Sequence, residues 1–141
     1  MILETLTTPA TAKEIASHVV KWLVNLNRAG EERKLQSLRA VNKVVSLARM
    51  TRAYARGLKV GEQDFNTEAN LAGQWSELAF ELKQLKLHAL AKKCDLKSRY
   101  WADPEQFSPD FLAEADISFD TVERLAREMS VRIESGRKIP G

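Results

Sequence analysis

Apolar residues recur at three- and four-residue steps along most of this chain, and that spacing is typical of amphipathic helices. The composition agrees, because only 6 Gly and 4 Pro occur among 141 residues, while the strong helix formers are abundant. We therefore predict an all-α fold with one domain over residues 1–141 and flexible ends at 1–9 and 136–141. The expected architecture is a bundle of four main helices with one or two short ones.

Turn and capping residues give the expected boundaries. A first helix runs from Pro9 to Leu26, and a turn at 27–30 separates it from a second over 31–56. Gly57 and Gly61 mark the most secure break, after which Asn66 or Thr67 caps the third helix. The later elements are a shorter helix over 89–96, a short one over 109–115 that begins with Ser108-Pro109, and a last one from Ser118 to Gly136.

The same spacing gives the expected buried stripes. The first helix carries Ile15, Ala16, Val19, Leu23 and Leu26, and the second carries Leu35, Leu38, Val41, Val45 and Ala48 before its row drifts to Leu47, Met50 and Tyr54. The third and last helices bury Leu71, Trp75, Leu78, Ala79 and Leu82, and Val122, Leu125, Ala126, Met129 and Ile133. The drift within the second helix indicates different packing partners at its two ends.

Several protein classes are disfavoured at once. The most apolar stretch, 19–26, is short and contains Lys21 and Asn25, so we expect no membrane span. The first nine residues carry no Lys or Arg, unlike a secretory leader. Cys94 is the only cysteine and can form no intramolecular disulfide, which fits a cytoplasmic location.

Charge is unevenly distributed. Residues 1–57 hold 10 basic and 4 acidic residues, a net charge of +6, whereas 101–134 hold 3 basic and 9 acidic, a net charge of −6. Arg49, Arg52 and Arg56 share one helix face, with Arg39 and Lys43 nearby. This face either meets the acidic segment, within one chain or between two copies, or stays open to bind a polyanion. A solvated helix face is the simpler interpretation.

Catalytic constellations are not apparent. His18 and His88 fall on different predicted helices, and Cys94 has no His one turn away to act as its base. Glu77 and Glu81 share a face but lack the Glu-x-x-His partner of a carboxylate metal site. Phosphate-binding, dinucleotide-binding and hydrolase motifs are missing as well. We expect no enzymatic activity, no cofactor and no metal, although an unusual hydrolase or nuclease site stays open as an alternative.

Three tryptophans are the remaining candidates. Trp75 lies on a buried stripe, and Trp22 lies beside one, where it closes the bundle edge or meets a partner. Tyr100 and Trp101 are adjacent in a segment that we predict to be non-helical, because Pro104 disfavours helix at Asp103. They either plug the open end of the bundle or anchor a protein partner.

These observations favour a small non-enzymatic helical interaction or adaptor domain. We expect it to self-associate through its basic N-terminal half and acidic C-terminal half, so that a protein partner or a second copy occupies the charged surfaces. The alternative is a nucleic-acid-binding accessory protein that contacts phosphates through Arg49, Arg52 and Arg56, with Arg39 and Lys43 beside them.

Overall fold

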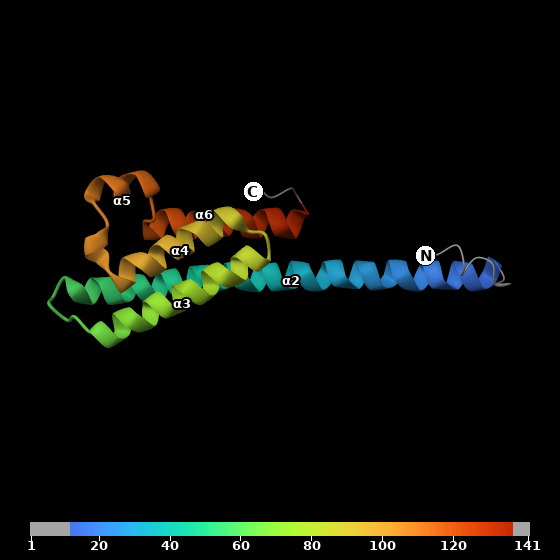
Figure 1. Ribbon diagram of the computed structural model, residues 1–141, viewed down its shortest axis with the longest axis horizontal. Coiled ribbons are helices and arrows are strands. Elements are labelled where there is room, and N and C mark those ends of the chain that lie inside the picture. Colours follow the sequence, from blue (N-terminus) through green and yellow to red (C-terminus); the bar gives the residue numbers. More distant parts are fainter. Residues whose placement is uncertain (1–11, 137–141) are drawn as a thin grey trace. The chain divides into compact units, whose positions relative to one another are not determined.

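A computed structural model describes residues 12–136, and this part of the chain is helical without a strand. The elements are α2 (Ala12–Leu58), α3 (Phe65–Gln84), α4 (His88–Ala102), the 3₁₀ turn η1 (Pro104–Gln106), α5 (Pro109–Ala115) and α6 (Phe119–Ser135) (Figure 1). The prediction of an all-α bundle is confirmed. The chain divides into two compact units, residues 1–33 and residues 34–141.

The predicted turn at 27–30 is wrong, because α2 is one helix from Ala12 to Leu58. A Cβ atom added at Gly30 would have no other atom within 4 Å, and the φ angle of Gly30 is not positive. Neither close packing nor backbone conformation therefore sets Gly30 apart from the other helical residues. A glycine within a helix costs only about 1 kcal/mol. Its neighbours Arg28, Ala29, Glu31 and Glu32 are compatible with helix, and that small cost does not end it.

The second unit, residues 34–141, is built around one apolar core. The last seven turns of α2 share this core with α3, α4 and α6, and the buried stripes predicted for α3 and α6 are confirmed, with Leu125 half-buried. On α2 the buried residues follow the expected drift, but Leu35 and Met50 are exposed while Val44 is buried instead. The fully buried large side chains are Trp75, Leu82, Leu90, Met129, Val41, Val44 and Val122.

A buried hydrogen bond fixes the centre of this core. The indole Nε1 of Trp75 donates to the Thr51 hydroxyl over 3.1 Å, and that hydroxyl donates to the Leu47 carbonyl over 2.7 Å. Both side chains are fully buried, so each polar atom has the partner that burial requires. The predicted placement of Trp75 in the core is therefore confirmed.

Local capping chemistry sets most helix ends. Ser108 and Ser118 cap α5 and α6 as expected, and Gly136 ends α6 with a left-handed φ of 71°. The break after α2 is also where expected, with Gly61 at φ 83°. The cap of α3 is Asp64 rather than Asn66 or Thr67, because its carboxylate accepts from the Asn66 N–H and the Thr67 hydroxyl.

Helix α4 is longer than predicted and includes Tyr100 and Trp101. Pro104 restricts only Asp103, which has extended backbone, so the helix continues to the residue before it. Burial of Trp101 in the core favours this extra turn and a half. The side chains of His18 and Trp22 lie outside the described part of the structure, as do the predicted flexible ends apart from Gly136.

Candidate interaction surfaces

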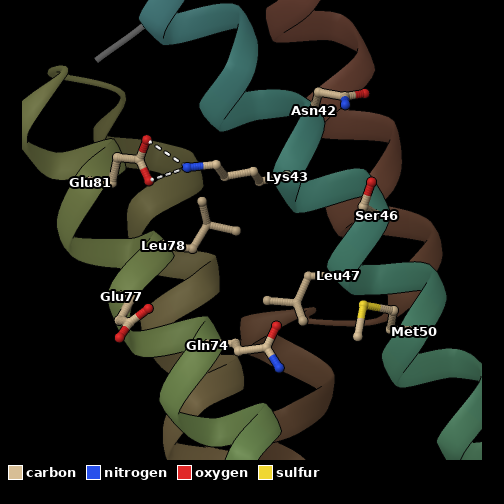
Figure 2. Close-up of a pocket in the computed structure, with 9 residues that line it drawn as sticks. All are labelled: Asn42, Lys43, Ser46, Leu47, Met50, Gln74, Glu77, Leu78 and Glu81. Carbon is tan, nitrogen blue, oxygen red and sulfur yellow. Dashed lines mark hydrogen bonds and ion pairs between the residues drawn. The ribbon is translucent and has the colours of Figure 1, made fainter.

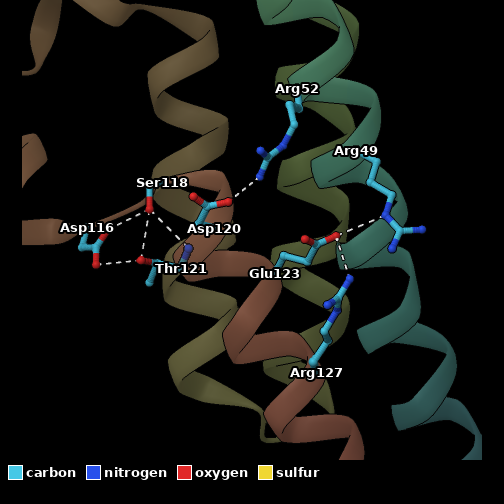
Figure 3. A network of polar contacts seen from close by, with 8 residues as sticks. All are labelled: Arg49, Arg52, Asp116, Ser118, Asp120, Thr121, Glu123 and Arg127. Atoms are coloured by element: carbon cyan, nitrogen blue, oxygen red, sulfur yellow. Dashed lines mark hydrogen bonds and ion pairs between the residues drawn. The ribbon is translucent and has the colours of Figure 1, made fainter.

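The predicted arginine row of α2 meets the acidic segment of the same chain. The Arg49 Nε atom lies 3.2 Å from a Glu123 carboxylate oxygen, and Arg52 Nη2 lies 2.7 Å from Asp120 (Figure 3). The hydrogen bond to Asp120 raises the pKa of Arg52, and its burial acts in the opposite direction. Glu123 also forms an ion pair with Arg127 of α6 over 3.6 Å, so one carboxylate contacts two guanidinium groups. Both contacts lie near solvent, where an ion pair stabilises a fold only weakly.

The other candidate cations divide into two groups. Lys43 forms an ion pair with Glu81 of α3 over 3.2 Å at one end of a groove of about 340 Å³ (Figure 2). Arg39 and Arg56 are exposed and make no ion pair with any residue that the structure describes. The row of three arginines is thus partly neutralised, and Arg39 and Arg56 keep free guanidinium groups.

Glu77 and Glu81 line the same groove, as their four-residue spacing predicts. Glu81 holds Lys43, and the remaining lining residues supply amide, hydroxyl and apolar groups rather than further carboxylates. Among the side chains that the structure describes, no group of three His, Cys, Asp or Glu residues is placed to hold a metal ion.

Trp101 lies inside the core instead of projecting from a loop. Its side chain is 7% exposed and packs edge-on against Tyr54, at 5.7 Å between ring centroids, and against Tyr100 at 5.5 Å. Such aromatic contacts add to the stability that burial itself supplies. Tyr100 is half-buried and continues toward Phe107, at 6.2 Å. These ring contacts form one aromatic cluster that runs from Tyr54 through Trp101 and Tyr100 to Phe107.

Cys94 is buried beside a lysine that the sequence did not single out. Burial raises the pKa of the Cys94 thiol to about 12, so the thiolate needed for nucleophilic chemistry is absent at neutral pH. Lys97 is 4% exposed, and burial lowers its pKa to about 8. Its ammonium lies 3.8 Å from the centroid of the Phe119 ring, which is a cation–π contact. Lys97 follows the helical spacing of the buried positions 90, 94 and 101, and a helix predicted beyond residue 96 would have included it.

The turn between α5 and α6 is held by one carboxylate. Asp116 adopts a left-handed backbone and accepts from the Thr121 hydroxyl over 2.7 Å and from the Ser118 hydroxyl over 3.0 Å (Figure 3). The hydrogen bond from Thr121 lowers the pKa of Asp116 most, and the one from Ser118 lowers it further. These contacts lie within the turn itself: Asp116 ends α5, and its carboxylate holds Ser118, which caps the start of α6.

The apolar row of the first unit is the largest departure from expectation. Val19 and Leu23, expected on a buried stripe, are exposed, as are their neighbours Val20 and Val24, with exposed fractions of 49–58%. The four residues share one face of α2 because they are spaced by one and four positions. No side chain described between 19 and 33 is buried. We call Val19, Val20, Leu23 and Val24 the α2 apolar row.

No helix among the described residues is long and apolar enough to cross a membrane. Comparisons with protein-family models, curated proteins and solved structures find no match to this chain.

Proposed function

We propose that this protein is a non-enzymatic interaction domain that self-associates through the α2 apolar row. The observation that carries the proposal is the exposure of four aliphatic side chains on one face of a helix. Contiguous apolar groups of this kind on a folded chain mark places where another molecule binds. Scattered single apolar residues would carry no such meaning, but these four are adjacent.

The helical state of this segment supports the same conclusion. A helix in water gains little from its own hydrogen bonds, and most helical stability in proteins comes from packing of the apolar face. None of the side chains that the structure describes in residues 19–33 is buried. A partner that covers the α2 apolar row would supply the missing packing.

A second copy is the partner that the charges favour. Between residues 19 and 33 the helix carries Lys21, Arg28 and Arg33 against Glu31 and Glu32, a net charge of +1. Two such segments repel each other little, and each supplies both signs for contacts at the rim of an interface. The basic row at Arg49 and Arg52 is a weaker driving force, because carboxylates of its own chain already contact it.

The test uses two substitutions that add the same charge on opposite faces. Leu23→Asp places a carboxylate in the α2 apolar row, and Asn25→Asp places one on an exposed position across the helix. Molar mass is measured by light scattering over a range of protein concentrations at about 0.5 M salt, which screens surface charge contacts. Circular dichroism verifies that both variants keep their helix content.

We expect the mass of the wild-type chain and of Asn25→Asp to rise with concentration. Leu23→Asp should remain at the monomer mass, because burying an unpaired carboxylate opposes association. A wild-type chain that stays monomeric throughout, or a Leu23→Asp variant that associates as the wild type does, would reject the proposal.

Nucleic-acid binding is a second candidate, favoured by the free guanidinium groups of Arg39 and Arg56. Guanidinium groups contact phosphates readily, and such binding weakens steeply with added salt. Fluorescence anisotropy with labelled DNA and RNA tests it, using Arg39→Glu and Arg56→Glu against Lys59→Glu, an exposed cation outside the row. Affinity lost in the first two variants and kept in the third supports this candidate, and equal affinity in all three removes it.

A further inference from the structure

A basic groove with an exposed aromatic ring lies between α3 and α4, a surface that neither charge counting nor motif searching identified. The Phe80 side chain is 66% exposed in it, and its cationic rim comes from Lys83, Lys92 and Arg99, with His88 nearby. Its volume is about 500 Å³. We call this surface the α3–α4 groove.

The charge of the groove is largely uncompensated. Its one carboxylate, Asp95, forms an ion pair with Arg99 one turn later on α4, over 3.1 Å. Lys83 and Lys92 are exposed and make no ion pair with any described residue. The groove therefore presents two free ammonium groups beside an exposed ring, a combination that fits a ligand carrying carboxylates and aromatic groups.

The same chain presents such a ligand in residues 103–116, which we call the acidic cap. It includes η1 and α5, and no Lys or Arg occurs between Arg99 and Arg124. Four of its carboxylates are exposed and form no ion pair with a described residue: Asp103, Glu105, Asp110 and Glu114. Phe107 and Phe111 stack at 5.4 Å between centroids, and Phe111 is 41% exposed.

The acidic cap does not occupy the groove of its own chain. Lys93 of α4 donates hydrogen bonds to the backbone carbonyls of Ala115 and Asp116, which ties the end of the cap to one face of α4. The groove residues Lys92 and Arg99 lie seven positions apart on a different face of that helix. Only the acidic cap of another molecule can reach this groove without release of these contacts.

We propose that the acidic cap of one copy docks in the α3–α4 groove of a second copy. Carboxylates of the cap meet Lys83 and Lys92, and the exposed ring of Phe111 lies against Phe80. This inference rests on the proposed self-association and adds a second contact to it. Because the two surfaces differ, the contact is head-to-tail, and repetition produces a ring or an open chain of copies.

The test reverses the charge of one surface at a time and then combines the two changes, first by mixing the variants and then in one chain. The groove variant is Lys83→Glu with Lys92→Glu, and the cap variant is Glu105→Lys with Glu114→Lys. All variants also carry Leu23→Asp, which removes the contact of the α2 apolar row. They are examined at about 50 mM salt, which preserves charge contacts. Sedimentation velocity measures the species present.

We expect the Leu23→Asp chain to form head-to-tail oligomers and each charge variant alone to associate roughly tenfold or more weakly. An equimolar mixture of the groove and cap variants should recover association, because the intact cap of the groove variant fits the intact groove of the cap variant, and the reversed groove and the reversed cap also carry opposite charges. A chain carrying all four charge changes should associate again, because its groove is acidic and its cap basic. This recovery shows that the variants are folded.

A mixture that remains monomeric, or a four-change chain that does not associate, overturns the proposal. Loss of binding to a single-stranded oligonucleotide in the groove variant, with no assembly of the mixture, would instead assign the groove to nucleic acid. The two self-association proposals fail separately. Charge changes that leave low-salt association intact reject only the cap contact, and Leu23→Asp without effect at high salt rejects only the apolar contact.

Discussion

Replacing Lys97 with methionine should stabilise the protein at neutral pH. Methionine has a similar length and no charge, so Lys97→Met removes an ammonium group from a site that is 4% exposed. The pKa of Lys97 falls from 10.5 to about 8 through burial, and each pKa unit corresponds to about 1.4 kcal/mol. The cost of keeping the charged form in the folded state is therefore about 3 kcal/mol.

The Phe119 ring offsets part of this cost. A cation 3.8 Å from an aromatic centroid gains on the order of 1 kcal/mol, which methionine would replace only in part. We thus expect Lys97→Met to raise the free energy of unfolding at pH 7 by about 2 kcal/mol. Urea denaturation measures this change, with Lys59→Met as the control at an exposed lysine outside both proposed contacts.

The stabilisation should depend on pH with a defined sign. Between about pH 8 and pH 10.5 the unfolded chain keeps the Lys97 proton while the folded chain has lost it, so rising pH favours folding. Cys94 acts oppositely, since its raised pKa lets only the unfolded thiol ionise above about pH 9. Below about pH 9 the Cys94 thiol is protonated in both states, and above it the Cys94 pKa depends on Lys97, so variant and wild type are compared between pH 7 and pH 9.

The difference in free energy of unfolding between variant and wild type should be largest at pH 7 and should shrink as the pH rises toward 9. A variant no more stable than the wild type at pH 7, or a difference that is constant with pH, would refute the burial of a charged Lys97.

Three further predictions concern the fold. Thr51→Val should lower the free energy of unfolding by about 1–3 kcal/mol in urea, because the Trp75 N–H loses its acceptor, and a neutral result would contradict that hydrogen bond. Gly30→Ala should raise the helix content measured by circular dichroism, because alanine favours helix more than glycine does. Gly61→Ala should lower the free energy of unfolding by about 1 kcal/mol, because Gly61 has a φ of 83°. A loss of helix content in Gly30→Ala would contradict the continuous α2. Arg52→Ala should destabilise less as salt is added, since its partner is an exposed carboxylate, and a salt-independent effect would contradict the ion pair.

Sequence reasoning succeeded where the cause of a structure is local. Ser108, Ser118 and Gly136 end helices through hydrogen bonds or backbone angles that involve a few neighbouring residues, so their identity was enough. Gly30 misled because the same residue type ends some helices and is tolerated in others at a small cost. Tyr100 and Trp101 misled because burial of the indole, a tertiary effect, lengthens α4.

The surfaces were harder to predict because they depend on distant residues. Opposite charge between Arg49 or Arg52 and the acidic segment was visible, but the partners Glu123 and Asp120 are 74 and 68 positions away. The α3–α4 groove joins residues of two helices whose relative rotation no local pattern specifies. Lys97 was overlooked because the predicted helix ended at residue 96, one position before it, and because a buried lysine is rare.

Amide hydrogen exchange of α2 at low and high protein concentration tests the central claim most directly. If a second copy covers the α2 apolar row, protection of residues 19–33 should increase with concentration in the wild type and not in Leu23→Asp. Protection of residues 19–33 that does not change with concentration would contradict self-association through this helix.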